Sequence, residues 1–203
     1  MIDTIDMPMA ISPTFRDRKK LAGMRQIQSA ALDLFEARGF DAVTVEEIAA
    51  AAGVSAPTVY RQFGTKEQLV LWDEYDPALF AAIRERLAIE PPMAAVRHGL
   101  VGTLDKIYTE DAGRILRRSR LISTDPGLKA ASAAGVAKMR EELVPMLMAS
   151  PFIGSPFNAE ILAAILIAIF EASAEEWLRT GGKFSLRSIF DEVFERLPQL
   201  TAS

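Results

Sequence analysis

The sequence predicts an all-α protein: a small N-terminal three-helix domain containing a helix-turn-helix, followed by a larger helical domain. Apolar residues recur at helical spacing, and no segment has the alternation or the β-branched density of a sheet. Short predicted helices near the N-terminus begin with capping signals. Of the 203 residues, 50% are apolar and 25% are charged, which is typical of a soluble globular protein.

The composition excludes several kinds of site. There is no cysteine, so a disulfide framework, an all-thiolate zinc site and a cysteine nucleophile are excluded. His98 is the only histidine, which rules out a two-histidine metal site. The sequence also lacks paired carboxylates, metal-ligand spacing and a glycine-rich phosphate loop. We therefore expect no catalytic residue, no metal and no cofactor.

The N-terminus and the charge pattern favour a soluble cytoplasmic protein. Residues 1–13 match neither a signal peptide nor a transit peptide, and we expect them to form a disordered tail. The longest uncharged apolar run, 161–170, is far shorter than the ~20 residues of a membrane span.

Net charge is −4, but the segment 16–25 is basic and indicates a local anionic partner.

The first helix is predicted over residues 15–38, with Ile27 and Phe35 on its apolar stripe. Gly39 is placed to end this helix in a left-handed conformation. Phe40 can then fold back on Phe35, as in a Schellman ending.

Two short helices are predicted next, over 45–52 and 56–63, with a turn at Gly53 between them. Thr44 begins a capping box for the first, and Ser55 can cap the second. Helices this short are marginal alone and must be stabilised by packing on a neighbour.

Longer helices follow, separated by proline and glycine signals. A fourth helix begins after Thr65 and ends near Leu71. The later helices are expected over 77–89, from Pro91-Pro92 to 108, over 109–123, from Asp125-Pro126-Gly127 to 148 with a bend at Pro145, over 158–179, and over 186–197.

The segment 44–63 has the layout of a DNA-binding helix-turn-helix. Val59 and Phe63, four residues apart, pack inward and leave the opposite face of the second short helix free. Small residues at the start of that face, followed by Tyr60 and Arg61, allow entry into a major groove about 12 Å wide. The predicted DNA contacts are Arg18, Lys19, Thr44, Ser55, Ala56, Pro57, Thr58, Tyr60, Arg61 and Lys66.

The alternative is an ordinary helical hairpin in which Tyr60 and Arg61 are merely solvated. Each residue alone fits that alternative. The capped short helices, the division into inward and outward faces, and the upstream basic segment together favour DNA binding.

The segment from Arg18 to Trp72 resembles the TetR family of bacterial regulators. The residues that carry the resemblance are 30–40 (AALDLFEARGF), 44–49 (TVEEIA), 53–55 (GVS), 58–61 (TVYR), Phe63 and 66–69 (KEQL). The resemblance implies a DNA-binding domain over 14–64 and a ligand-binding and dimerisation domain over 65–203. Two residues depart from the family pattern. Gln62, where many relatives carry histidine or another residue, leaves the operator sequence open, and Pro57 limits base hydrogen bonding at its position.

The C-terminal half resembles an actinobacterial subgroup that includes the mycofactocin-cluster regulators. The segment 114–126, the residues 175–178 (EEWL) and Gly181-Gly182 carry this resemblance. It implies an acyl-CoA effector, and another lipophilic compound remains open.

The two most apolar C-terminal helices predict a homodimer. The run 161–170 is apolar on nearly every side, so it is either wholly internal or faces a partner. Two helices from each copy would form a four-helix interface. The predicted interface residues are Ile161, Ile165, Ile169, Trp177, Ile189, Phe190 and Phe194; the alternative is a buried monomer core.

The effector pocket is expected among the middle helices, where apolar residues exceed what a small core needs. Its predicted lining is Leu100, Leu104, Ile107, Leu116, Leu121, Met139 and Leu143, although plain core residues would show the same pattern. The predicted function is a repressor that binds a palindromic DNA operator as a homodimer and is released by a small effector. A helical enzyme and a protein-binding adaptor are the alternatives.

Overall fold

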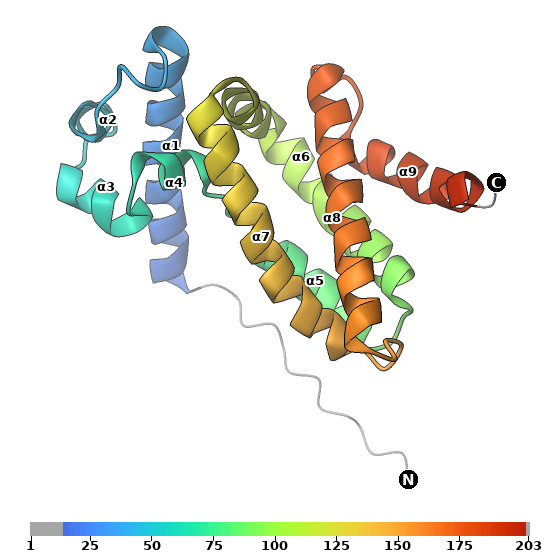
Figure 1. Ribbon diagram of the computed structural model, residues 1–203. Coiled ribbons are helices and arrows are strands. Elements are labelled where there is room, and N and C mark those ends of the chain that lie inside the picture. The colour runs from blue at the N-terminus through green and yellow to red at the C-terminus, as the bar shows by residue number, and fades with distance from the viewer. Residues whose placement is uncertain (1–13, 202–203) are drawn as a thin grey trace. The chain divides into compact units, whose positions relative to one another are not determined.

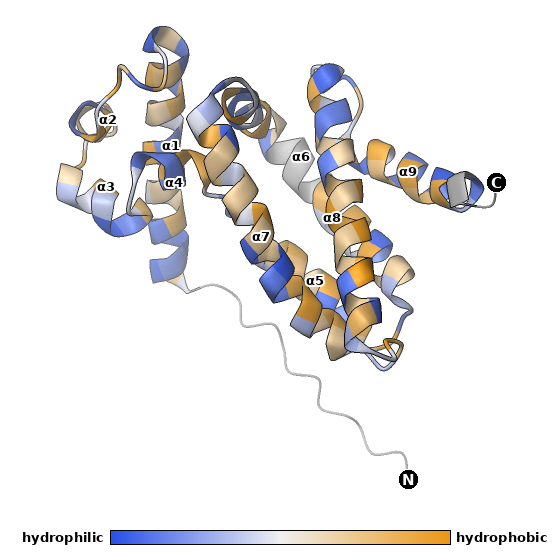
Figure 2. Ribbon diagram, in the orientation of Figure 1, coloured by the Kyte–Doolittle hydropathy of each residue, from blue (hydrophilic) through white to orange (hydrophobic). Residues whose placement is uncertain are grey.

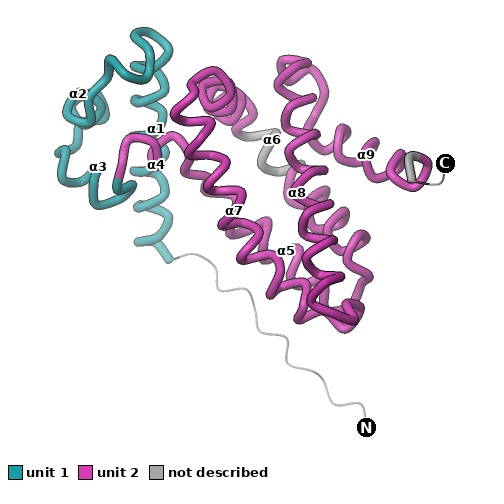
Figure 3. Tube along the Cα trace, in the orientation of Figure 1, with its two compact units in different colours: residues 1–64 teal, residues 65–203 magenta. Residues whose placement is uncertain are grey.

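The computed structural model describes the backbone of residues 14–201 and the side chains of 14–104 and 111–199. Within this part the chain is entirely α-helical, without a strand, as predicted. Figure 3 shows its two compact units, Met1–Gly64 and Thr65–Ser203. The tail 1–13, predicted to be disordered, lies outside the described residues.

The first unit contains α1 (Phe15–Arg38), α2 (Val45–Ala51) and α3 (Ala56–Phe63). Its core forms where the three helices meet, and its large buried apolar side chains include Ile27, Leu32, Phe35, Ile48 and Val59. Both short helices place apolar residues in this core, which supplies the stabilisation that their length cannot.

The end of α1 agrees with the prediction in the positive φ of Gly39 and in the contact of Phe40 with Phe35, but Gly39 has a ψ of 156°, which is not that of the left-handed helical region. Gly39 has a positive φ of 85°, and its N–H donates to the carbonyl of Phe35 at 2.8 Å. The ring of Phe40 packs on Phe35 with a centroid separation of 5.1 Å. This contact turns the chain toward α2.

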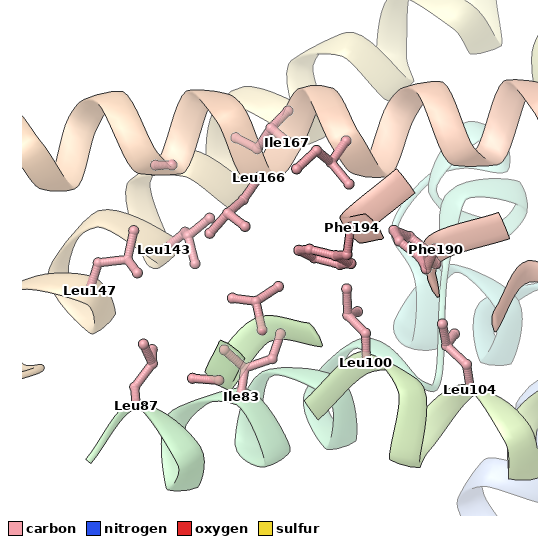
Figure 4. Packing of buried hydrophobic residues seen from close by; sticks show 14 of the residues in the cluster. Ile83, Leu87, Leu100, Leu104, Leu143, Leu147, Leu166, Ile167, Phe190 and Phe194 are labelled. Carbon is pink, nitrogen blue, oxygen red and sulfur yellow. The ribbon is translucent and has the colours of Figure 1, made fainter. Parts of the chain in front are cut away.

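The second unit contains α4 (Lys66–Leu71), α5 (Asp76–Leu87), α6 (Pro92–Thr124), α7 (Pro126–Met148), α8 (Pro156–Arg179) and α9 (Leu186–Thr201). Within this unit α7 and α8 run side by side, and α9 packs on α6 and α8 (Figure 1). Figure 4 shows the core between them, where Leu100 and Leu104 of α6 face Phe190 and Phe194 of α9.

One prediction about the second unit is wrong. The segment predicted as two helices, meeting at residues 108–109, is a single 33-residue helix, α6. Between Pro92 and Asp125 the chain has no proline, and extending a helix that has already formed adds a hydrogen bond for each residue fixed. A threonine that could cap a new helix is not enough to end the existing one.

Smaller differences concern helix ends. The helix α8 begins at Pro156, two residues before the predicted start, because Ser155 caps it by accepting from the N–H of Asn158 at 3.2 Å. The helix α9 continues to Thr201 instead of ending at residue 197, and Pro198 lies inside it.

Candidate nucleic-acid interface

The helix α3 divides into a buried and an exposed side. Val59 and Phe63 are 2% and 8% exposed and pack into the first unit, whereas Tyr60 is 48% exposed. Pro57 and Arg61 are also exposed, and Ala56 is half-buried. The helix therefore presents small residues near its start and then an aromatic hydroxyl and a guanidinium, on a side that the first unit leaves open.

The start of α3 differs from the prediction. Ser55 occupies the N-cap position, but its hydroxyl makes no capping hydrogen bond. An N-cap hydroxyl usually accepts a hydrogen bond from the backbone N–H of the second or third residue of the helix, and Pro57, the second residue of α3, has no N–H. The Ser55 hydroxyl instead pairs with the hydroxyl of Thr58 at 2.9 Å. Two predicted DNA contacts are thus brought together as an exposed hydroxyl pair.

The turn before α3 is held from α1. Gly53 has a φ of 68°, which suits glycine, and the N–H of Val54 donates to the carbonyl of Ala49 at 2.9 Å. The side-chain amide of Gln26 donates to the carbonyl of Ala52 at 2.9 Å. This hydrogen bond ties the end of α2 to α1 just before the turn, and no pattern within the helix-turn-helix itself predicts it.

The start of α2 carries a predicted phosphate contact beside a carboxylate. The hydroxyl of Thr44 accepts from the N–H of Glu47 at 3.2 Å, and the N–H of Thr44 donates to Glu47 Oε2 at 2.8 Å, which is a capping box. The hydrogen bond from Arg38 and the backbone N–H of Thr44 lower the pKa of Glu47 to about 2. Arg38 thus compensates a negative charge that would otherwise repel a phosphate near Thr44.

The basic predicted residues other than Arg61 lie on α1 and α4. Arg18 and Lys19 are exposed in the first turns of α1. That helix begins with a capping box between Thr14 and Asp17 that the sequence interpretation missed, although the T-x-x-D spacing was visible. Lys66 is half-buried in the first turn of α4 and belongs to the second unit.

The predicted pocket residues fall into several environments. Leu100, Leu104 and Leu143 are buried in the core cluster of the second unit, and Leu116 and Met139 pack against it half-buried. Leu121 is also half-buried, but it is not among the described residues that form the core cluster or pack against it. The side chain of Ile107 lies outside the described residues.

The predicted dimer residues also divide by their burial within one copy. Ile169, Trp177, Ile189, Phe190 and Phe194 are at most 9% exposed and belong to the core of their own copy. Helical periodicity showed that these residues are apolar but could not show which side of each helix the protein itself covers. Ile161 and Ile165 are exposed.

Two arginines of α6, Arg114 and Arg118, form ion pairs with the connector that precedes α5. Arg114 pairs with Glu74 and with Asp111, and Arg118 pairs with Asp73 and donates to the carbonyl of Trp72 at 2.7 Å. These side chains are largely buried, with exposed fractions of 13–14% for the two arginines and 2% for Glu74.

This ion-pair network fixes the connector between α4 and α5. The hydroxyl of Tyr75 donates to Asp111 Oδ2 at 2.9 Å, and burial, followed by this hydrogen bond, raises the pKa of Tyr75 to about 12. Burial opposes the charge of Arg114, but its carboxylate partners hold its pKa above the usual range. The two arginines therefore attach residues 72–75 to α6.

Both parts of the chain match known families. Residues 27–71 match the model for "bacterial regulatory proteins, tetR family", and residues 90–201 match the model for the MftR C-terminal domain. The transcriptional regulator TcmR of Streptomyces glaucescens is 28% identical over 202 residues, covering 94% of this chain and 89% of TcmR.

Solved structures show the same fold. NalD of Pseudomonas aeruginosa, the secondary repressor of the MexAB-OprM multidrug efflux pump, has a TM-score of 0.58 at 18% identity, covering 90% of this chain and 96% of NalD. Thermus thermophilus FadR, a repressor solved with lauroyl-CoA, has a TM-score of 0.51 at 25% identity, covering 86% of this chain and 93% of FadR.

The C-terminal match covers more than half of the chain, and the N-terminal match includes the whole helix-turn-helix. Proteins with this pair of domains are DNA-binding transcriptional regulators and not enzymes. The chain therefore belongs to the TetR family of bacterial regulatory proteins, with a C-terminal domain of the MftR type.

Proposed function

We propose that this protein is a cytoplasmic repressor that binds a palindromic operator as a homodimer and is released by a small apolar or amphipathic effector. The observation that carries the proposal is the open side of α3, where Pro57, Tyr60 and Arg61 are exposed while Val59 and Phe63 anchor the helix. In this proposal residues 14–64 bind DNA, and residues 65–203 bind the effector and the second copy.

The contacts divide by chemistry. Arg61 reaches a guanine edge or a phosphate, and the hydroxyls of Ser55, Thr58 and Tyr60 donate to phosphates. Arg18 and Lys19 add positive charge in the first turns of α1. One short helix contacts few base pairs, so two copies on half-sites one helical turn apart combine their affinities.

The effector is proposed to bind among α5 to α8, where the core of the second unit is almost wholly apolar. Long-chain acyl-CoA is the first candidate, and the lauroyl-CoA in the FadR structure supports it. Other lipophilic compounds are the alternative. Binding is proposed to change the separation of the two recognition helices through α4, which requires different effector affinities in the two states.

The test is fluorescence anisotropy with labelled DNA from upstream of the protein's own gene, with scrambled DNA as the control. We expect specific binding that weakens as lauroyl-CoA is added, while free coenzyme A has no effect. No difference between the two DNAs would refute operator recognition and favour a protein-binding adaptor. Operator binding that stays constant with lauroyl-CoA and with other apolar candidates would refute release by a lipophilic effector.

A further inference from the structure

The helix α8 carries one hydroxyl group that is fully buried and has no hydrogen-bond partner. Ser173 is 0% exposed, and its Oγ makes no hydrogen bond. Among the described residues, two other buried side-chain atoms also lack a partner, Nε of Arg118 and Oε1 of Gln62, but each belongs to a side chain with further polar atoms. Ser173 has only this one polar side-chain atom, so all of its side-chain hydrogen-bonding capacity is unused.

The hydroxyl of Ser173 also does not bond to its own helix. A hydroxyl within a helix can donate to the carbonyl of the residue four positions earlier. Thr103 of α6 does so, donating to the carbonyl of Gly99 at 2.8 Å. Ser173 makes no such bond to Ile169, at the same spacing. Its hydroxyl is therefore left for a group from outside α8.

The surroundings of Ser173 are apolar. One turn away on the same side of α8 lie Ile169 and Trp177, which are 6% and 3% exposed and belong to the core cluster of the second unit. Phe170 packs on Phe190 of α9 with a centroid separation of 5.9 Å. In Figure 2 the middle of α8 is largely orange and tan, in agreement with this apolar composition. An unpaired hydroxyl is unfavourable in such surroundings, so a core that served packing alone would carry an apolar residue here.

A buried water molecule would find few partners beside Ser173. Such a water needs two to four polar groups. At positions three and four residues from Ser173 on α8, only Glu176 and Trp177 carry polar side-chain atoms. Both carboxylate oxygens of Glu176 already accept from Arg179, at 2.6 and 2.7 Å. The side chains of α8 thus offer a water at most one donor besides the hydroxyl itself.

We propose that Ser173 is the polar contact of the effector site and binds a neutral oxygen, a carbonyl or a hydroxyl, on an otherwise apolar effector. The proposal rests on the proposed function, since it names the residue and the chemical group through which that site selects its ligand. A serine hydroxyl both donates and accepts, so it can pair with the carbonyl of a thioester or with an alcohol. Ligand sites in proteins are mostly apolar and contain a few placed polar groups, which matches this part of the core.

The absence of a nearby cation indicates that the effector oxygen is uncharged. A carboxylate buried beside Ser173 would need a positive partner. The positions three and four residues away on α8 include no basic residue. The largely buried arginines of α6, Arg114 and Arg118, are already paired with Glu74 and Asp73. A thioester carbonyl or an alcohol meets these conditions, and the anion of a free fatty acid does not.

Isothermal titration calorimetry of the full chain with lauroyl-CoA and S-dodecyl-CoA tests the proposal, because the second compound has a CH₂ group in place of the carbonyl. The wild type should bind lauroyl-CoA about 3- to 10-fold more tightly, the effect of one neutral hydrogen bond. Ser173→Ala should bind both compounds with equal affinity. If the wild type binds neither, 1-octanol and 1-chlorooctane form the second pair, and the same difference there would identify an alcohol instead of a thioester.

Urea denaturation without effector gives an independent measurement. Ser173→Ala should raise the midpoint, because it removes an unpaired buried hydroxyl. Ser150→Ala is the matched control and should lower it, since Ser150 is also buried but donates to the carbonyl of Leu87 at 2.9 Å. Ser132→Ala, within α7, measures the gain from helix propensity, which the gain at Ser173 should exceed. A lower midpoint for Ser173→Ala would show that its hydroxyl has a partner in the free protein, such as a bound water, and would overturn the proposal.

The binding results separate this proposal from the proposed function. Equal affinity of the wild type for both members of each pair, an unchanged preference in Ser173→Ala, or no binding of any of the four compounds would overturn the Ser173 contact. If both members of a pair release the operator equally well, the contact fails and the ligand-released repressor stands. If a compound binds with the Ser173-dependent preference but leaves operator binding unchanged, the contact stands and release by this effector is refuted.

Discussion

Arg38 and Glu47 join the end of α1 to the beginning of α2 through a hydrogen-bonded ion pair of 2.8 Å. The other carboxylate oxygen of Glu47 accepts from the N–H of Thr44 at 2.8 Å, so one side chain serves both as a link between helices and as a cap. The arrangement fixes the start of α2 relative to α1.

Replacing Glu47 by glutamine should reduce the dependence of stability on pH. The pKa of Glu47 is about 2 in the folded protein against an ordinary 4.5, so folding favours the ionised form. Its contribution is complete above pH 4.5 and is lost as the pH falls toward 2. We expect a smaller loss of melting temperature over this interval in Glu47→Gln than in the wild type. Glu46→Gln, with the same charge change, should retain the wild-type profile.

Arg61→Ala should weaken operator binding by about 1–3 kcal/mol if Arg61 contacts a base, and should relax the preference at one base pair. The measurement is anisotropy with the operator and with single-base variants. Arg84→Ala on α5, another exposed arginine, should bind as the wild type does. Equal affinities for Arg61→Ala and the wild type would remove Arg61 from the DNA contacts.

Lys66→Ala should weaken binding to all sequences alike and lower the slope of log K against log salt by about 1. Lys66 opens α4 after the cap formed by Thr65. Titrations at several salt concentrations, with specific and scrambled DNA, measure both effects. An unchanged slope would show that Lys66 does not contact phosphate.

Gly99→Ala should destabilise the second unit, because a Cβ at Gly99 would lie 2.9 Å from Cγ1 of Ile83 and 3.0 Å from its Cα. The expected cost is roughly 1–3 kcal/mol, as for other overpacked sites. Gly102→Ala is the matched control, since nothing lies within 4 Å of its Cβ. It should stabilise the helix by up to about 1 kcal/mol. Urea denaturation of both variants checks the difference in sign.

Arg114→Met should destabilise the protein by about 3–5 kcal/mol, because the buried carboxylates of Glu74 and Asp111 lose their ion pairs with Arg114. Adding Glu74→Gln should recover part of this loss by removing a buried charge that has lost this ion pair. The four proteins form a double-mutant cycle, measured by urea denaturation. Additive effects in this cycle would show that the two residues are not coupled.

The sequence was most informative where local signals determine structure. The bounds of α1 and α3, the turn at Gly53 and the Phe35–Phe40 contact agree with predictions from glycines and short-range apolar spacing. The capping box of α1 was missed, and Ser55 makes no capping hydrogen bond at the start of α3. The family resemblance was likewise carried by this region, and the comparisons confirm it.

Other features that the sequence did not predict depend on contacts between residues that are far apart along the chain. The helix α8 is apolar on nearly every side, so its pattern could not show that Ile169 would be covered and Ile165 exposed. The pairing of Arg114 with Glu74 spans 40 residues and leaves no periodic signal. Gln26 lies outside the helix-turn-helix whose turn it holds.

The attachment of residues 72–75 to α6 makes the α4–α5 connector a stiff mechanical element. Ion pairs between arginine and carboxylate restrict the rotation of both side chains, and Arg118 also donates a hydrogen bond to the backbone carbonyl of Trp72. A shift of α6 along its axis would therefore move residues 72–75 with it, because the connector cannot change its conformation independently. Since α4 ends at Leu71, one residue before Trp72, the same shift would displace α4.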